Sequence, residues 1–143
     1  MHIRAVITAM AVFATAIGAA GAAAAKTVNL KLSHGFPSVH GLQTEFLMPW
    51  IKTLQERTNG GVEVTIYPAG SSFGGLERQL DQVKSGVVDL ALGLSVVPRD
   101  RMPRTALMDL PFLTPDRSVG NRALWSIANT ALAPDYDGLK LLG

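Results

Sequence analysis

Residues 62–94 read VEVTIYPAGSSFGGLERQLDQVKSGVVDLALGL and predict a strand, a loop, a helix and a second strand. In 62–66, apolar residues alternate with polar ones, which is the period of a half-buried strand. Gly, Ser and Pro fill 68–75, and apolar residues then recur at helical spacing in 76–86. The run 87–94 is largely apolar, as in a strand buried on both faces. This strand–helix–strand unit predicts an α/β fold with a mainly parallel sheet.

The pattern continues toward the N-terminus. Residues 26–33 alternate in the same way and predict another strand. A helix follows from Leu42 to Leu54, because Leu42, Phe46, Trp50 and Leu54 recur at every fourth position. Pro49 lacks a backbone N–H, so we expect it to kink this helix, which ends at 58–61.

Toward the C-terminus the expected elements are shorter. The apolar segment 106–113 predicts a strand that bends at Pro111, and 115–132 predicts a helix. A turn at 135–138 leads into an expected terminal strand at 139–142. Such a strand has nothing after it in the sequence to cover it, so either the sequence is a fragment of a longer protein or the strand pairs with another part of the chain.

Residues 1–25 have the features of a secretory signal peptide. A basic start containing Arg4 precedes an apolar stretch, and Ala23 and Ala25 supply the small residues that a signal peptidase recognises. The predicted cut lies before Lys26. There is no twin arginine, so the general secretion route is favoured over the route for folded proteins.

Composition excludes several classes of function. The chain has 143 residues, a net charge of +2 and no cysteine. Without cysteine there is no disulfide framework, no thiolate metal site and no lipidated N-terminal cysteine. The small charge gives no sign of nucleic-acid binding. An exported chain of this kind fits a periplasmic protein that is not embedded in the membrane once the signal peptide is removed.

Four stretches together resemble a known family. They are LKLSHGFPSVH at 30–40, RTNGGVEVTIYP at 57–68, FGGLERQLDQVKSGVVDLA at 73–91, and LPFL at 110–113 with GLKLLG at the end. Behind a signal peptide and in this order, they resemble the N-terminal part of the solute-binding subunit of tripartite ATP-independent periplasmic (TRAP) transporters, the DctP-type family.

This resemblance implies a lobe of a type II periplasmic-binding-protein fold at residues 26–143, with the second lobe missing. Family members close two lobes on an organic acid, such as a dicarboxylate, and deliver it to a membrane permease. Their ligand-clamping arginine lies in the second lobe, so no residue of this chain is assigned to it. Leu94 stands where some sialic-acid binders of the family have an acidic residue, which argues against that ligand.

Ligands of parallel sheets bind at the carboxyl ends of the strands, so the candidate site residues lie in the loops that follow the three expected strands. His34 and Gly35 occupy the tip of the first loop, where His34 would donate a hydrogen bond to a carboxylate. The alternative is a histidine that contacts only backbone or water. Ser71 and Ser72 would either cap the next helix or direct hydroxyl and N–H groups at an anion.

The third loop supplies two more candidates. Ser95 follows the expected strand 87–94, and Arg101 lies among three arginines around Asp100. Arginine suits a carboxylate contact at the mouth of a cleft, although such charged loops are commonly only solvated.

The leading hypothesis is therefore a non-catalytic binding protein that needs no cofactor or metal. Asp135 and Asp137 are spaced like calcium ligands, but a turn explains them better. One alternative is an exported ligand-binding sensor domain. An exported hydrolase is less favoured, because we find no nucleophile paired with a base.

Overall fold

The computed structural model describes residues 26–142, so the predicted signal peptide and its cleavage site lie outside the described residues. The described chain alternates strands and helices in its first two thirds and is helical after that. The elements are β1 (Val28–His34), η1 (Leu42–Leu47), α2 (Met48–Arg57), β2 (Val62–Tyr67), η2 (Leu76–Arg78), α3 (Gln79–Lys84), β3 (Leu90–Leu92), α4 (Pro103–Ala106), η3 (Leu107–Asp109), α5 (Arg117–Ile127) and η4 (Ala133–Tyr136).

The three strands form one parallel sheet in the order β2-β1-β3. In the register, Ser33 of β1 lies beside Tyr67 of β2 and Ala91 of β3. Because the strands are parallel, their carboxyl ends meet at one edge of the sheet. The loops that follow them are 35–41, 68–75 and 93–102, and the first two have the positions that the sequence predicts.

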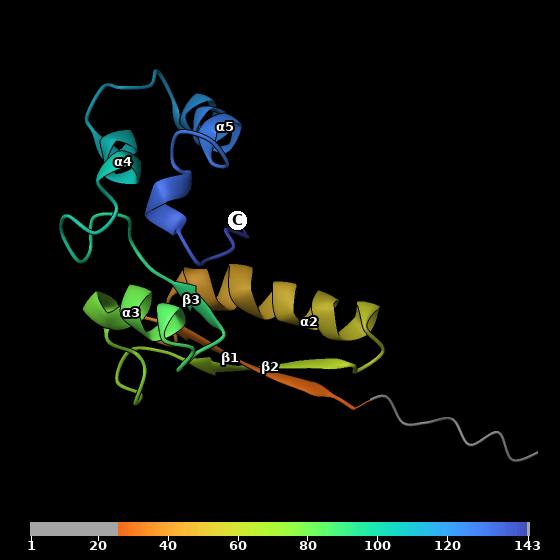
Figure 1. Cartoon of the computed structure of the whole chain (residues 1–143). Helices are drawn as coiled ribbons and strands as arrows, with labels where there is room; N and C mark the ends of the chain where they lie inside the picture. The colour runs from red at the N-terminus through yellow and green to blue at the C-terminus, as the bar shows by residue number, and fades with distance from the viewer. Residues whose placement is uncertain (1–25, 143) are drawn as a thin grey trace, which may run out of the picture.

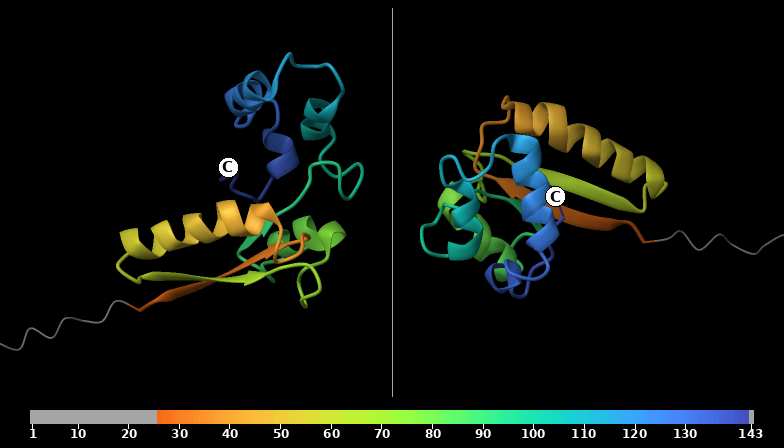
Figure 2. Two further views of the ribbon diagram at one scale, coloured as in Figure 1. Left: turned by 180° about the vertical axis from the view of Figure 1, so that it is seen from behind. Right: turned by 90° about the horizontal axis from the view of Figure 1, so that it is seen from above.

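Helices cover both faces of the sheet (Figures 1 and 2). Val64 and Ile66 face α2, and Leu32, which pairs with Ile66, therefore points to the same side. Leu32, Leu47 and Ile51 are buried there. Ser33 points to the opposite face and hydrogen-bonds Gln79 of α3. The sheet thus separates two helical layers, which is the architecture expected for an α/β lobe.

The helix predicted from Leu42 to Leu54 is present, and it begins as a π-helix. In η1 the N–H of Met48 bonds to the carbonyl of Gln43, five residues earlier. Pro49 lies in the first turn of α2, immediately after this π-helical segment. Proline has no backbone N–H, and the first turn of an α-helix is where that N–H would have no partner within the helix. The change from π-helix to α-helix at Met48 therefore accommodates Pro49.

Three of the sequence predictions are wrong. Residues 106–113 form α4, η3 and turns rather than a strand, and 139–142 contain no strand. The strand expected at 87–94 is reduced to Leu90–Leu92, whose residues are half-buried rather than covered on both faces. The sheet is therefore smaller than the sequence indicates.

A long-range contact caps α4, the first helix after β3. Pro103 occupies the first position of α4, which suits its fixed φ. Asp135 of η4 is buried, and its Oδ2 accepts hydrogen bonds from the N–H and the hydroxyl of Thr105, at 2.7 and 3.0 Å. Figure 1 shows the helices after β3 gathered on the α2 side of the sheet. In residues 26–142 no helix is long and apolar enough to cross a bilayer.

Candidate ligand-binding edge of the sheet

His34 ends β1, and its ring is buried rather than open to a ligand. Its Nδ1 accepts a hydrogen bond from the backbone N–H of Phe36 at 3.3 Å. Nδ1 therefore carries no proton, so in the neutral ring Nε2 donates to Oε1 of Gln43 at 3.1 Å. Both ring nitrogens are thus used inside the protein, and His34 holds η1 against the end of β1.

Burial also sets the protonation state of His34. Desolvation lowers the pKa of His34 below its ordinary value of 6.5, and the nearby His40 acts in the same direction. The hydrogen bond to Gln43 opposes this shift but does not reverse it. The neutral ring is the form that fits the observed contacts. Phe36 stacks on His40, with ring centroids 5.0 Å apart, and continues this aromatic group toward the surface.

Gly35 lies where the first loop passes under the start of η2. A Cβ built on Gly35 would approach the Cβ of Leu76 to 2.5 Å, so only glycine fits there. The loop after β2 contacts the first loop as well. The N–H of Ala69 donates to the carbonyl of Phe36 at 2.9 Å. The first two loops therefore form one continuous surface.

Gln79 is a central residue of this edge that the sequence reasoning missed. It is 2% exposed and lies at the start of α3. Its Oε1 accepts a hydrogen bond from the hydroxyl of Ser33. Its Nε2 donates to the carbonyls of Phe73 and Gly75, at 3.1 and 3.0 Å. A glutamine on a helix gives no sequence signal of burial, since most glutamines are exposed.

The two predicted serines lie in the loop between β2 and η2. The hydroxyl of Ser71 donates to the carbonyl of Pro68 at 2.6 Å, and Ser72 is exposed. Neither serine caps the following helix. The N-cap of η2 is Gly75, and no side chain accepts a capping hydrogen bond at that position. The capping alternative is therefore wrong.

Ser95 and Arg101 are held by acidic residues. The hydroxyl of Ser95 donates to Oδ2 of Asp109. The guanidinium of Arg101 forms an exposed ion pair with Asp81 of α3, with Nη2 2.6 Å from Oδ1 and Nη1 3.4 Å from Oδ2. Arg101 is thus tied to the outer side of α3 rather than to His34 or Ser71.

These bonds limit which side chains remain to bind an anion. The protons of His34, Ser71 and Ser95 are already donated within the protein. Arg101 uses two of its five donors on Asp81, and Ser72 is accessible to solvent. Arg101 and Ser72 are therefore the predicted site residues with a donor available to a carboxylate.

Residues 70–74 (GSSFG) also have the G-x-S-x-G spacing of a nucleophile elbow, which the sequence reasoning overlooked. Ser72 would be the nucleophile. Within residues 26–142, the hydrogen bonds of His34 and His40 join the rings to Gln43, Phe36 and Leu42, and none reaches Ser72. The structure therefore shows no histidine base in place for this serine.

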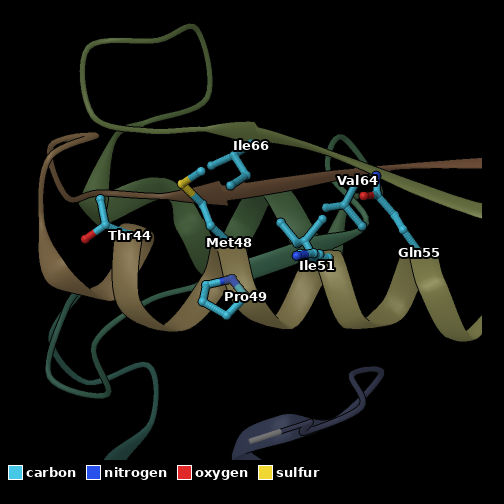
Figure 3. A pocket seen from close by; sticks show the side chains of 8 residues that line it. Thr44, Met48, Pro49, Ile51, Gln55, Val64 and Ile66 are labelled. Atoms are coloured by element: carbon cyan, nitrogen blue, oxygen red, sulfur yellow. The ribbon is translucent and has the colours of Figure 1, made fainter.

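An open groove of about 640 Å³ lies elsewhere, between α2 and β2 (Figure 3). Figure 3 shows Met48, Ile51, Val64 and Ile66 directed into it. Its cation, Lys52, lies 3.9 Å from Glu56. A groove so apolar lacks the convergent polar groups that fix a carboxylate, so it does not replace the strand edge as the candidate site. The described part of the chain contains no cluster of three potential metal ligands.

Residues 32–142 match the family model of bacterial extracellular solute-binding proteins, family 7 (DctP). Solved structures of TRAP solute-binding proteins are similar as well. One from an unidentified marine microbe, specific for aromatic acid ligands and bound to 3-hydroxybenzoate, has 29% identity and a TM-score of 0.77 over 82% of this chain. One from Rhodoferax ferrireducens with copurified benzoate has 26% identity and a TM-score of 0.74 over 82%. One from Bordetella bronchiseptica with bound (R)- and (S)-mandelate has 26% identity and a TM-score of 0.63 over 81%.

These similarities confirm the predicted fold as a lobe of such a binding protein. The chain spans 36–37% of the length of the three structures. No match was found among curated proteins.

Proposed function

Because the chain belongs to the DctP family of bacterial extracellular solute-binding proteins, we propose that it forms one lobe of the periplasmic solute-binding subunit of a TRAP transporter. Its partners would be a small organic acid and a membrane permease. The similar structures are solute-binding proteins, which supports a non-catalytic role over that of an exported hydrolase. A gene for a permease next to this one would favour transport over the role of a sensor domain.

We further propose that the acid is an aromatic carboxylate. The observation that carries this is the set of ligands in the three similar structures, 3-hydroxybenzoate, benzoate and mandelate, each of which joins a ring to a carboxylate. The meeting of three strand ends at one edge supports the location of the site. Since the chain is little more than a third of those proteins, a second lobe would complete the cleft.

The site residues have different proposed roles. Arg101 and Ser72 would donate to the carboxylate directly. Gly35, Ser71 and Ser95 would shape the surface on which the ligand lies. His34 would act through Gln43 and Phe36, since its ring is buried.

Thermal unfolding with a matched pair of ligands tests the proposal. Benzoate should raise the melting temperature, because a ligand that binds only the folded state adds about 1.4 kcal/mol at ten times its Kd. Benzamide has the same shape without the charge and should have no effect. One lobe should bind weakly, so benzoate is titrated to about 50 mM at constant ionic strength. Equal shifts with both compounds, or none with benzoate, 3-hydroxybenzoate or mandelate, would contradict the proposal.

A further inference from the structure

The side chain of Gln79 contacts the end of β1, the loop that follows β2 and the residue after β3. It accepts from Ser33, the penultimate residue of β1. It donates to Phe73 and Gly75 in the loop after β2. Its Cβ would lie 3.4 Å from a Cβ at Gly93, so it also packs against the residue that follows β3 by one position.

Both N–H donors of the Gln79 amide and one lone pair of its oxygen are used at these contacts. One N–H is used on each of the two loop carbonyls, and the oxygen is used on the Ser33 hydroxyl. Because Gln79 is almost completely buried, losing any of these bonds would leave a polar group without water to replace the partner.

The loop that Gln79 holds has little freedom to adjust. Gly74 is buried, and a Cβ built on it would lie 1.9 Å from the carbonyl oxygen of Pro68. Phe73 adds an edge-to-face contact with Tyr67, with ring centroids 4.9 Å apart. Ser71 and Ser72, two of the candidate ligand residues, lie between these fixed points.

We propose that Gln79 is a positioning residue of the ligand site: it sets the conformation of loop 68–75 and thereby the affinity for a carboxylate. The effect of Gln79 on carboxylate affinity rests on the proposed function. The effect of Gln79 on the loop conformation does not, because it is measured without a ligand.

Three substitutions separate the contacts. Gln79→Glu keeps an acceptor for Ser33 and loses the donors to the loop. Ser33→Ala leaves those donors in place and removes only the bond from β1. Gln82→Met is the matched control, because Gln82 is also buried on α3 and its Oε1 has no hydrogen-bond partner in the described structure.

Amide hydrogen exchange measures the loop. In the Gln79→Glu variant we expect at least tenfold faster exchange at Ala69, Ser71 and Gly74, while Leu32 in the sheet keeps its protection. A loss of global stability alone would accelerate all four amides together. Ser33→Ala should accelerate the loop less, and Gln82→Met should leave it unchanged. Unchanged loop exchange in both the Gln79→Glu and Ser33→Ala variants overturns the inference. If Gln79→Glu does not fold, Ser33→Ala decides alone.

Benzoate binding then tests the effect on carboxylate affinity. The Kd of Gln79→Glu should rise on the order of tenfold, since a loosened loop no longer presents its groups in one geometry. Gln82→Met should bind like the parent chain. A loosened loop with unchanged Kd overturns the link to affinity. If the parent chain binds no benzoate, 3-hydroxybenzoate or mandelate, the proposed function fails, and the exchange data still decide whether Gln79 controls the loop.

Discussion

At the scale of single residues, His34 should make the stability of the chain depend on pH. Its pKa in the folded state lies below the ordinary value of 6.5, because burial disfavours the charged ring. As the pH falls through 6.5, the unfolded chain therefore takes up a proton before the folded chain does. The free energy of unfolding should decrease from about pH 6.5 downward, until the folded pKa is reached.

Urea denaturation at pH values from about 7.5 to 5 measures this effect. His34→Gln removes the titrating group and should flatten the profile between pH 6.5 and 5. His40→Gln changes an exposed ring and removes only the smallest contribution to the His34 shift, so most of the slope should remain. An unaltered slope in the His34→Gln variant would assign the pH dependence to other groups.

Phe112 is a second residue with a sharp prediction. Its φ is 62°, a region that L-residues with large side chains rarely adopt, and its side chain is fully exposed. Phe112→Gly removes the backbone strain without losing buried contacts. The strain costs about 1–2 kcal/mol, and the added freedom of glycine in the unfolded chain offsets part of it. We expect a net gain of about 0.5–1 kcal/mol.

The control for this variant is Phe112→Ala, which removes the ring and keeps a Cβ at positive φ. It should gain little in urea denaturation. Equal gains in both variants would show that removal of the exposed ring, rather than relief of the backbone, is responsible.

At the scale of elements, Asp135 should stabilise α4 from 30 positions further along the chain. Asp135→Ala leaves the N–H and the hydroxyl of Thr105 buried without their acceptor. We expect a loss of about 2–3 kcal/mol in the free energy of unfolding. Asp137→Ala, in the exposed turn beside it, is the matched control and should cost less than about 0.5 kcal/mol. Equal losses in the two variants would contradict the capping role.

The same contact shows why part of the fold could not be predicted from the sequence. The apolar segment 106–113 has the composition of a short strand, but it follows a helix that a distant carboxylate caps, and it forms η3 and turns. Periodicity contains no information about such a partner. Strands β1 and β2 and the helices η1–α2 and α3 were predicted correctly, because each has a repeating apolar face that its own residues define.

For the candidate site, too, one part was predictable from the sequence and another was not. Strand order places the loops at one edge, so their location was predictable from the alternation of strands and helices. The roles of the side chains were not, because they depend on which polar atoms are already paired. His34 was expected to reach a ligand but uses both nitrogens internally, and Gln79 gave no signal at all.

At the scale of the whole molecule, the described chain leaves a group of apolar side chains exposed. Leu107, Leu110, Phe112 and Leu113 lie within seven residues of one another and are each at least 50% exposed. Soluble monomers seldom expose so many large apolar groups together. We expect the folded chain to bind the dye 8-anilinonaphthalene-1-sulfonate at neutral pH and to associate as its concentration rises.

Two serine substitutions distinguish this surface from dye binding by a loosened core. Replacing both Leu110 and Leu113 with serine should reduce the dye fluorescence and the association measured by sedimentation, because it removes two exposed apolar side chains. The melting temperature should change little, since half-exposed leucines contribute only part of their burial energy. Val39→Ser is the control, because Val39 is 85% exposed in a different loop. Dye binding that persists in the double variant together with non-cooperative unfolding would instead indicate a loosely packed chain, since a molten globule binds the dye through its whole core.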